Sequence, residues 1–142
     1  MEPDKEKISK LPPHIQADLK KAQWSNYLES VGEKVSQRGG DVFVERDDVA
    51  IAFNFSVGGG AAVQFSVVTK MEVDPEKRSD ALERLNLISC PFFRPRITRS
   101  GVFYAECFLP ANDACMENLK LAYELLPMVL PGLQKEFAAF TA

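Results

Sequence analysis

The strictest constraint on the fold is a run of alternating side chains between positions 49 and 57. Large apolar residues stand at every second position of this run: Val49, Ile51, Phe53, Phe55 and Val57. Successive residues of a β-strand point to opposite faces, so this period of two predicts a strand with one apolar face. Gly58 to Gly60 follow, and the alternation resumes at Val63, Phe65 and Val67. The short link predicts that the two strands pair antiparallel.

Three further segments complete a predicted five-stranded sheet. Val42 and Val44 begin a strand before the alternating run, with an acidic turn at Asp47-Asp48 between them. The segments 92–98 and 102–109 predict a later pair, joined by a turn at Ser100-Gly101. Pro95 cannot donate a ladder hydrogen bond, so its strand is expected at an edge or a bulge.

Helical periodicity predicts two helices ahead of the final one. Trp24, Leu28, Val31 and Val35 recur at steps of three and four residues, which favours a helix over 14–37 that begins at Pro12-Pro13 and stops at Gly39-Gly40. A second helix is predicted to begin at Asp74-Pro75 and to end at Pro91. Its apolar face contains four residues: Ala81, Leu82, Leu85 and Ile88.

The last helix is predicted to begin near Asn112 and to run to Phe140, with an apolar stripe along its length. Pro127 and Pro131 interrupt it. Each proline removes a helical hydrogen bond and crowds the preceding turn, so a kink or a break is expected, with 132–140 as a short second piece.

The resulting order is helix, three strands, helix, two strands, helix. This order predicts an α+β fold with a five-stranded, largely antiparallel sheet, whose apolar face is covered by the first and last helices. Residues 1–11 are charged and poor in apolar groups, and they are interpreted as a flexible N-terminal tail. Residues 12–142 are expected to form a single domain, since 142 residues suit one domain.

Charge and composition narrow the classes of partner. Lys and Arg number 17 against 20 Asp and Glu, a net charge of -3, which disfavours general binding to nucleic acid or to an anionic membrane. The sequence has no run of about 18 apolar residues and no signal-peptide core, so no membrane contact is expected. Three irregularly spaced cysteines favour a reducing compartment, and the cytoplasm is the expected location.

The residue types of catalysis are scarce, and we predict no enzyme, cofactor or metal site. His14 is the sole histidine and has no partner of the usual kind. Gly58 to Gly60 lacks the lysine and hydroxyl spacing of a phosphate loop. Cys107 lies in an alternating strand and is interpreted as core. Cys115 lies near the predicted start of the last helix, where a thiol could become reactive.

One cluster combines aromatic and basic residues: Phe92, Phe93, Arg94, Arg96 and Arg99. The alternation places Arg94 and Arg96 on one face of a strand. The first interpretation is a solvated strand face beside two core phenylalanines. The second is a polypeptide-binding patch, because aromatic residues and arginine are enriched in interface hot spots. Single-stranded nucleic acid, which stacks on aromatic side chains, ranks third.

A family resemblance accompanies these patterns from about Trp24 to Phe140. The segment 81–86 carries a Leu85-Asn86 pair, the segment 92–109 has the form of a hairpin, and a long apolar helix follows. This order resembles the YbjN family of bacterial proteins, within the type III secretion chaperone-like fold. The resemblance implies a non-enzymatic protein, often dimeric, that presents apolar patches to another polypeptide.

The resulting hypothesis is a non-catalytic protein-binding module, a chaperone-like or regulatory adaptor that forms a homodimer. Six residues on the second helix and the following strand are the candidate interface: Leu82, Leu85, Phe92, Phe93, Arg94 and Arg96. The alternative is a small-ligand-binding or thiol-dependent protein that uses the concavity of the sheet. A reactive Cys115 would indicate this alternative.

Overall fold

The computed structural model describes residues 7, 10–46 and 48–142. The predicted tail over 1–11 therefore falls mostly outside the described residues, as does Asp47 of the predicted acidic turn. The elements in chain order are α2 (Pro13–Ser30), β1 (Val35–Arg38), β2 (Asp41–Glu45), β3 (Val49–Val57), β4 (Ala62–Glu72), η1 (Pro75–Lys77), α3 (Arg78–Leu87), β5 (Arg94–Ile97), β6 (Val102–Pro110) and α4 (Cys115–Ala138).

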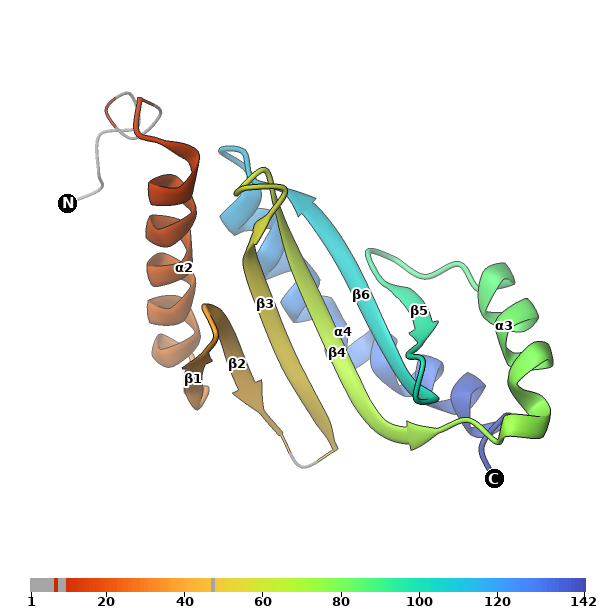
Figure 1. Cartoon of the computed structure of the whole chain (residues 1–142). Helices are drawn as coiled ribbons and strands as arrows, with labels where there is room; N and C mark the ends of the chain where they lie inside the picture. Colours follow the sequence, from red (N-terminus) through yellow and green to blue (C-terminus); the bar gives the residue numbers. More distant parts are fainter. Residues whose placement is uncertain (1–6, 8–9, 47) are drawn as a thin grey trace.

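The strands form one sheet in the order β1-β2-β3-β4-β6-β5, and every neighbouring pair is antiparallel (Figure 1). The predicted α+β fold is confirmed. In the register of the two longest pairs, Phe53 lies opposite Phe65 and Phe65 lies opposite Cys107. The large apolar residues of β3, β4 and β6 therefore stand side by side on one face. β5 is an edge strand, as Pro95 indicates.

The sheet has six strands because the predicted first helix was too long. The α2 helix ends at Ser30, and Val35–Arg38 forms the edge strand β1. Gly32 has a φ of +89°, which lies in the left-handed region and ends the helix. Gly39 and Gly40, with φ of +59° and +87°, form the two-residue turn between β1 and β2 and not a helix cap.

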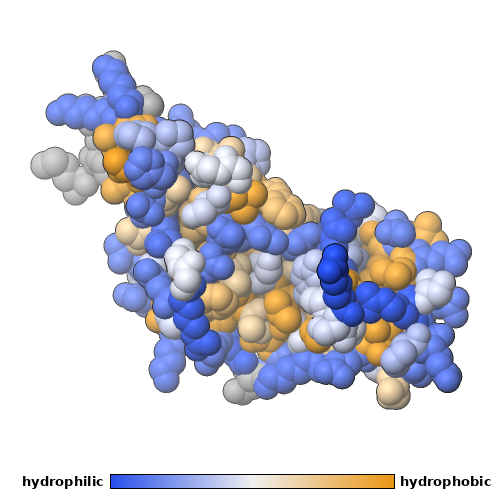
Figure 2. Space-filling model, in the orientation of Figure 1, coloured by the Kyte–Doolittle hydropathy of each residue, from blue (hydrophilic) through white to orange (hydrophobic). Residues whose placement is uncertain are grey.

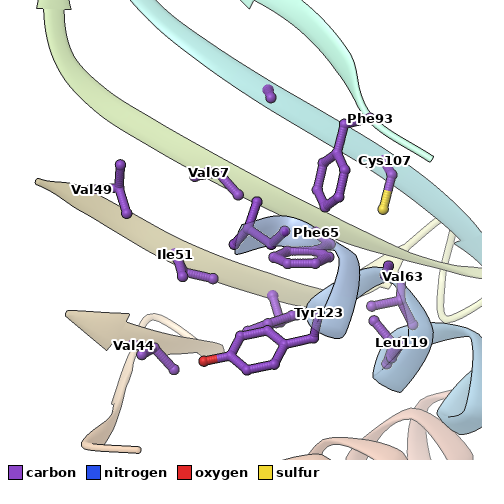
Figure 3. Packing of buried hydrophobic residues seen from close by; sticks show 14 of the residues in the cluster. Val44, Val49, Ile51, Val63, Phe65, Val67, Phe93, Cys107, Leu119 and Tyr123 are labelled. Carbon is purple, nitrogen blue, oxygen red and sulfur yellow. The ribbon is translucent and has the colours of Figure 1, made fainter. Parts of the chain in front are cut away.

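The apolar face is covered by α2 and α4, as predicted. Trp24 of α2 meets the ring of Phe53 edge-on at 5.2 Å, and Phe137 of α4 stacks on Phe103 at 4.5 Å. Figure 1 shows α4 behind the strands, and Figure 3 shows Tyr123 and Leu119 of this helix among the buried side chains of the sheet. Burial of these aromatic rings provides the main driving force for the fold.

The expected break in the last helix does not occur. The α4 helix runs without interruption from Cys115 to Ala138 and contains both Pro127 and Pro131. Both prolines are exposed, whereas Leu126 and Leu133 are buried against the sheet on either side of them. Packing on both sides of the proline segment therefore holds the two halves in one continuous helix, and it compensates for the hydrogen bonds that the two rings remove.

The segment of η1 and α3 begins where Asp74-Pro75 predicts the start of a helix. The carboxylate of Asp74 accepts a hydrogen bond from the backbone amide of Glu76 at 3.1 Å, and Pro75 opens η1. The α3 helix then begins at Arg78 and buries Ala81 and Leu85. Arg84 of α3 pairs with Glu136 of α4 at 3.0 Å, so the two helices are also joined at the surface.

Candidate interaction surfaces

The face of the sheet opposite α2 and α4 is called here the open face, and none of the described helices lies over it (Figure 1). Seven side chains in its middle, none of them buried, are Phe43, Ala50, Ala52, Ser66, Val68, Tyr104 and Phe108, and the polar side chains of Asn54, Gln64 and Glu106 lie among and beside them on β3, β4 and β6. Figure 2 shows pale, tan and orange atoms gathered over the middle of this face, with blue atoms around them. Phe108 is 53% exposed. The open face therefore combines exposed apolar side chains with polar ones on the same strands.

A polar network lies on the open face around Glu106 of β6. Glu106 is only 7% exposed although it lies on this uncovered side. One of its carboxylate oxygens accepts a hydrogen bond from Arg96 Nε at 2.8 Å, and the other accepts one from Gln64 Nε2 at 3.0 Å. Both oxygens are thus satisfied, as a buried carboxylate requires.

Arg94 is placed differently from Arg96. It lies directly across from Glu106 in the β5–β6 register. Among the residues that the structure describes, however, no hydrogen bond or ion pair engages its exposed side chain. Arg96 and Gln64 already occupy the carboxylate of Glu106. Arg94 therefore presents an uncommitted positive charge beside the apolar part of the open face.

The two phenylalanines before β5 point in different directions because of the backbone at Phe92. Phe92 has a φ of +66°, the only positive φ at a non-glycine residue in the described part of the chain. The amide of Phe93 donates to the carbonyl of Pro91 at 2.8 Å, which makes a γ-turn centred on Phe92. This strained turn leaves Phe92 exposed and buries Phe93 against Phe65, at 5.0 Å between ring centres.

An apolar groove, called here the α3–α4 groove, lies between the end of α3 and the flank of α4. Its volume is about 350 Å³. Nine residues line it: Ile88, Ser89, Cys90, Pro91, Met128, Val129, Gly132, Leu133 and Glu136. Met128 is 78% exposed, and Leu87, next in the chain to the groove, is 72% exposed. Such exposure of large apolar side chains is typical of interaction sites when they lie close together.

The six predicted interface residues divide into three groups. Leu85 and Phe93 are buried in the core, so they do not belong to the exposed surface. Arg94 and Arg96 lie on the open face, where Arg96 is held by Glu106. Leu82 and Phe92 are exposed on α3 and on the loop before β5. Leu87 and Met128 were absent from the predicted interface, and Leu87 lies outside the apolar face that was predicted for its helix.

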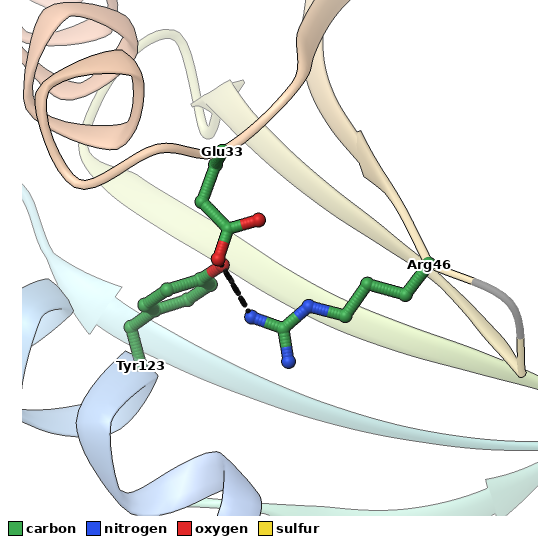
Figure 4. Close-up of polar contacts among 3 residues, drawn as sticks. All are labelled: Glu33, Arg46 and Tyr123. Atoms are coloured by element: carbon green, nitrogen blue, oxygen red, sulfur yellow. Dashed lines mark hydrogen bonds and ion pairs between the residues drawn. The ribbon is translucent and has the colours of Figure 1, made fainter.

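A second polar cluster joins three elements near β2. Arg46 Nη2 donates to Glu33 Oε1 at 2.9 Å and to the hydroxyl of Tyr123 at 2.7 Å (Figure 4). Burial raises the pKa of Tyr123 to about 12, with a further contribution from its hydrogen bond to Glu33. Glu33 follows α2 and Tyr123 belongs to α4. The cluster therefore connects the ends of β2 and α2 to the final helix.

Replacement of Arg46 by alanine should destabilise the protein by about 1 to 3 kcal/mol, because the partly buried Tyr123 and Glu33 each lose a charge-assisted hydrogen bond. Urea unfolding measures the change. Arg38→Ala is the matched control, because the Arg38–Glu45 pair is widely exposed, at 68% and 71% of the side chains. Its loss should be below about 1 kcal/mol. Equal losses in the two variants would contradict a connecting role for Arg46.

The cysteines do not have the environment of a reactive thiol. Cys115 is indeed the first residue of α4, but it is fully buried, and burial raises its pKa. Cys107 is buried as well, and burial raises its pKa to about 12. Burial also raises the pKa of Cys90. A raised pKa keeps a thiol protonated at neutral pH, so the geometry gives no support to a thiol-dependent function.

No group of three or more His, Cys, Asp and Glu side chains among the described residues is placed to hold a metal ion. None of the described helices combines the length and the apolar character that crossing a membrane requires.

The arrangement defines an α+β protein in which helices cover one face of an antiparallel sheet. The same architecture is found in the crystal structure of YbjN from E. coli, which is described as a proposed transcription regulator. The TM-score is 0.53 at 12% sequence identity, over 85% of this chain and 94% of that chain. No protein-family model matches the sequence, and no curated protein matches it. At this identity the likeness establishes a YbjN-like fold, which confirms the structural part of the resemblance.

Proposed function

We propose that this protein is a non-catalytic protein-binding module, a chaperone-like or regulatory adaptor, and that it works as a homodimer. The observation that carries the proposal is the exposure of Met128 in the α3–α4 groove and of Leu87, which directly precedes the lining residue Ile88 in the chain. Exposed apolar side chains at a groove lose water contact favourably when another polypeptide covers them.

The charge of the chain supports protein partners over nucleic acid. YbjN is described as a proposed transcription regulator. This chain carries 17 basic and 20 acidic residues, which gives little of the phosphate neutralisation that direct binding to DNA requires. A regulatory role would therefore operate through contacts with other proteins. Its cysteines are unpaired, which supports the cytoplasm as the site of that role.

The homodimer is tested by light scattering over a range of concentrations. The wild type should have twice the chain mass of 15.8 kDa, and Leu87→Lys/Met128→Lys should have the single mass. Lysine is a good helix former, so both changes suit exposed helical positions. The matched control is Leu19→Lys/Val31→Lys, which places the same charges on exposed apolar positions of α2 and at its end.

The outcomes separate the parts of the proposal. A dimer that persists in Leu87→Lys/Met128→Lys would remove the α3–α4 groove as the dimer contact. A wild type that stays at 15.8 kDa at every concentration would overturn the homodimer itself. Symmetric dimers place the same patch of both subunits in contact, so a single pair of substitutions affects both halves of the interface.

A further inference from the structure

We propose that the open face binds an amphipathic helix of another polypeptide, and that a carboxylate on this helix pairs with Arg94. The inference rests on the protein-binding function proposed above, but it does not require the homodimer. It concerns a different surface, because the α3–α4 groove is formed by α4 and the end of α3, whereas the open face lies on the opposite side of the sheet from α4.

The relief of the open face fits a helix. The middle of its floor has small or short side chains on β3 and β4, with Ala52 directly opposite Ser66 and Ala50 opposite Val68, and the longer Asn54 and Gln64 form the next pair along these strands. Aromatic residues stand on the strands to either side: Phe43 on β2, and Tyr104 and Phe108 on β6. Three strand spacings of about 4.8 Å separate β2 from β6, roughly 14 Å in all. The aromatic side chains narrow this width toward the diameter of a helix, about 10 to 12 Å.

The length of the floor also suits a helix. Nine residues of β3 extend over about 30 Å. A helix of about 18 residues has a length of roughly 27 Å, so it would cover the strand. Large apolar side chains spaced three and four residues apart on the docking helix would lie on the small floor residues, as helices do when they pack on a sheet.

The charges around Arg94 determine the sign of the charge that a partner must carry. Arg94, Arg96 and Arg99 lie on β5 and the turn after it. Glu106 lies across the β5–β6 pair from Arg94, and its carboxylate is occupied by Arg96 and Gln64. Arg94 thus remains available at the edge of an apolar surface. A carboxylate from the docking helix would complete a bidentate pair there, and it would leave no charge buried without a partner.

The test is a selection from a display library of helical peptides of about 18 residues with randomised positions. The wild type should enrich peptides that have apolar residues at steps of three and four and that carry Asp or Glu. Arg94→Glu should enrich Lys or Arg in place of the acidic residues. The matched control is Arg99→Glu, an exposed arginine in the turn, which should enrich the same peptides as the wild type.

A second variant locates the bound peptide. Ala52→Lys raises a long side chain from the centre of the floor and leaves the apolar core of the sheet unchanged, because Ala52 points to the open face. The Ala52→Lys variant should bind the enriched peptides tenfold more weakly or worse than the wild type does. Circular dichroism and a thermal melt verify that each variant is folded.

Each contrary outcome has its own meaning. If Arg94→Glu enriches the same acidic peptides as the wild type, the proposed pairing with Arg94 is overturned. Peptides that bind Ala52→Lys normally but fail on Leu87→Lys/Met128→Lys would overturn the inference and keep the protein-binding function, with the groove as its site. A loss of dimer mass in Ala52→Lys would identify a second copy of this chain as the occupant and would also overturn it.

Discussion

Replacing Trp24 by alanine is expected to lower the free energy of unfolding by about 3 to 5 kcal/mol, a large part of the stability of a domain of this size. The Trp24 side chain is completely buried. It stacks on Tyr27 at 5.2 Å and meets Phe53 and Tyr123 edge-on at 5.2 and 6.0 Å. Trp24 thereby joins α2 to β3 and to α4, so its removal leaves a cavity where three elements meet.

A milder substitution shows which property of Trp24 matters. The indole Nε1 is buried and has no hydrogen-bond partner among the residues that the structure describes. Trp24→Phe therefore removes volume but no hydrogen bond, and it should cost about 1 to 2 kcal/mol, well below the alanine variant. Val31→Ala, at a position that is 51% exposed just after α2, is the control and should change stability by less than about 0.5 kcal/mol. Urea unfolding at constant m-value measures all three.

A loss below about 1 kcal/mol in Trp24→Ala would show that α2 does not depend on this contact. A loss in Trp24→Phe as large as in Trp24→Ala would show that the indole nitrogen, and not the ring volume, carries the stability. Either result would contradict the packing argument. The three variants can be compared directly because all of them change α2 or the residue just after it.

The sheet core could be predicted from the sequence because β3 and β4 alternate strictly. Val49 to Phe55 and Val63 to Val67 all bury the residues that the alternation selects. β1 could not be predicted in the same way. Val31 and Val35 continue the helical spacing of Trp24 and Leu28, and that spacing is also compatible with a strand that begins after a turn. Gly32 decides between them, and a single glycine is a weak signal inside a periodic run.

The candidate surfaces were less accessible to sequence reasoning. The pair Phe92-Phe93 gives no indication of which ring is buried, since the γ-turn at Phe92 depends on the loop between Pro91 and β5. The network of Glu106 depends on strand register, which brings together Gln64 and Arg96 from two different neighbouring strands. The α3–α4 groove depends on how two helices meet. Tertiary contacts of this kind have no local pattern in the sequence.

Alkaline pH is expected to destabilise the protein strongly from about pH 9 upward. Burial raises the pKa of Cys107 from its ordinary value of 9.0 to about 12, and that of Tyr123 from 10.0 to about 12. Both groups are neutral when protonated. Between the ordinary and the raised pKa values, the folded state therefore keeps two protons that the unfolded state releases. Their contribution to stability is fully present below pH 9 and is lost as the pH rises toward 12.

The magnitude follows from linkage. A shift of one pKa unit corresponds to about 1.4 kcal/mol, so the free energy of unfolding should fall by about 2 to 4 kcal/mol between pH 9 and pH 11. Urea unfolding at a series of pH values measures this slope. Cys107→Ala should reduce the slope, because alanine cannot ionise, even though the variant is somewhat less stable at neutral pH.

The test compares how steeply the free energy of unfolding falls with pH, and not its value at one pH. A loss of packing in a variant therefore does not affect the prediction. Tyr123→Phe removes the second group and also the hydrogen bond from Arg46, so it should start lower at pH 7 and decline less steeply above pH 10. A slope that stays unchanged in Cys107→Ala would show that the Cys107 thiol ionises as readily in the folded chain as in the unfolded one. That result would require solvent access to the region between β6 and the ring of Phe93, which lies beside Cys107 in Figure 3.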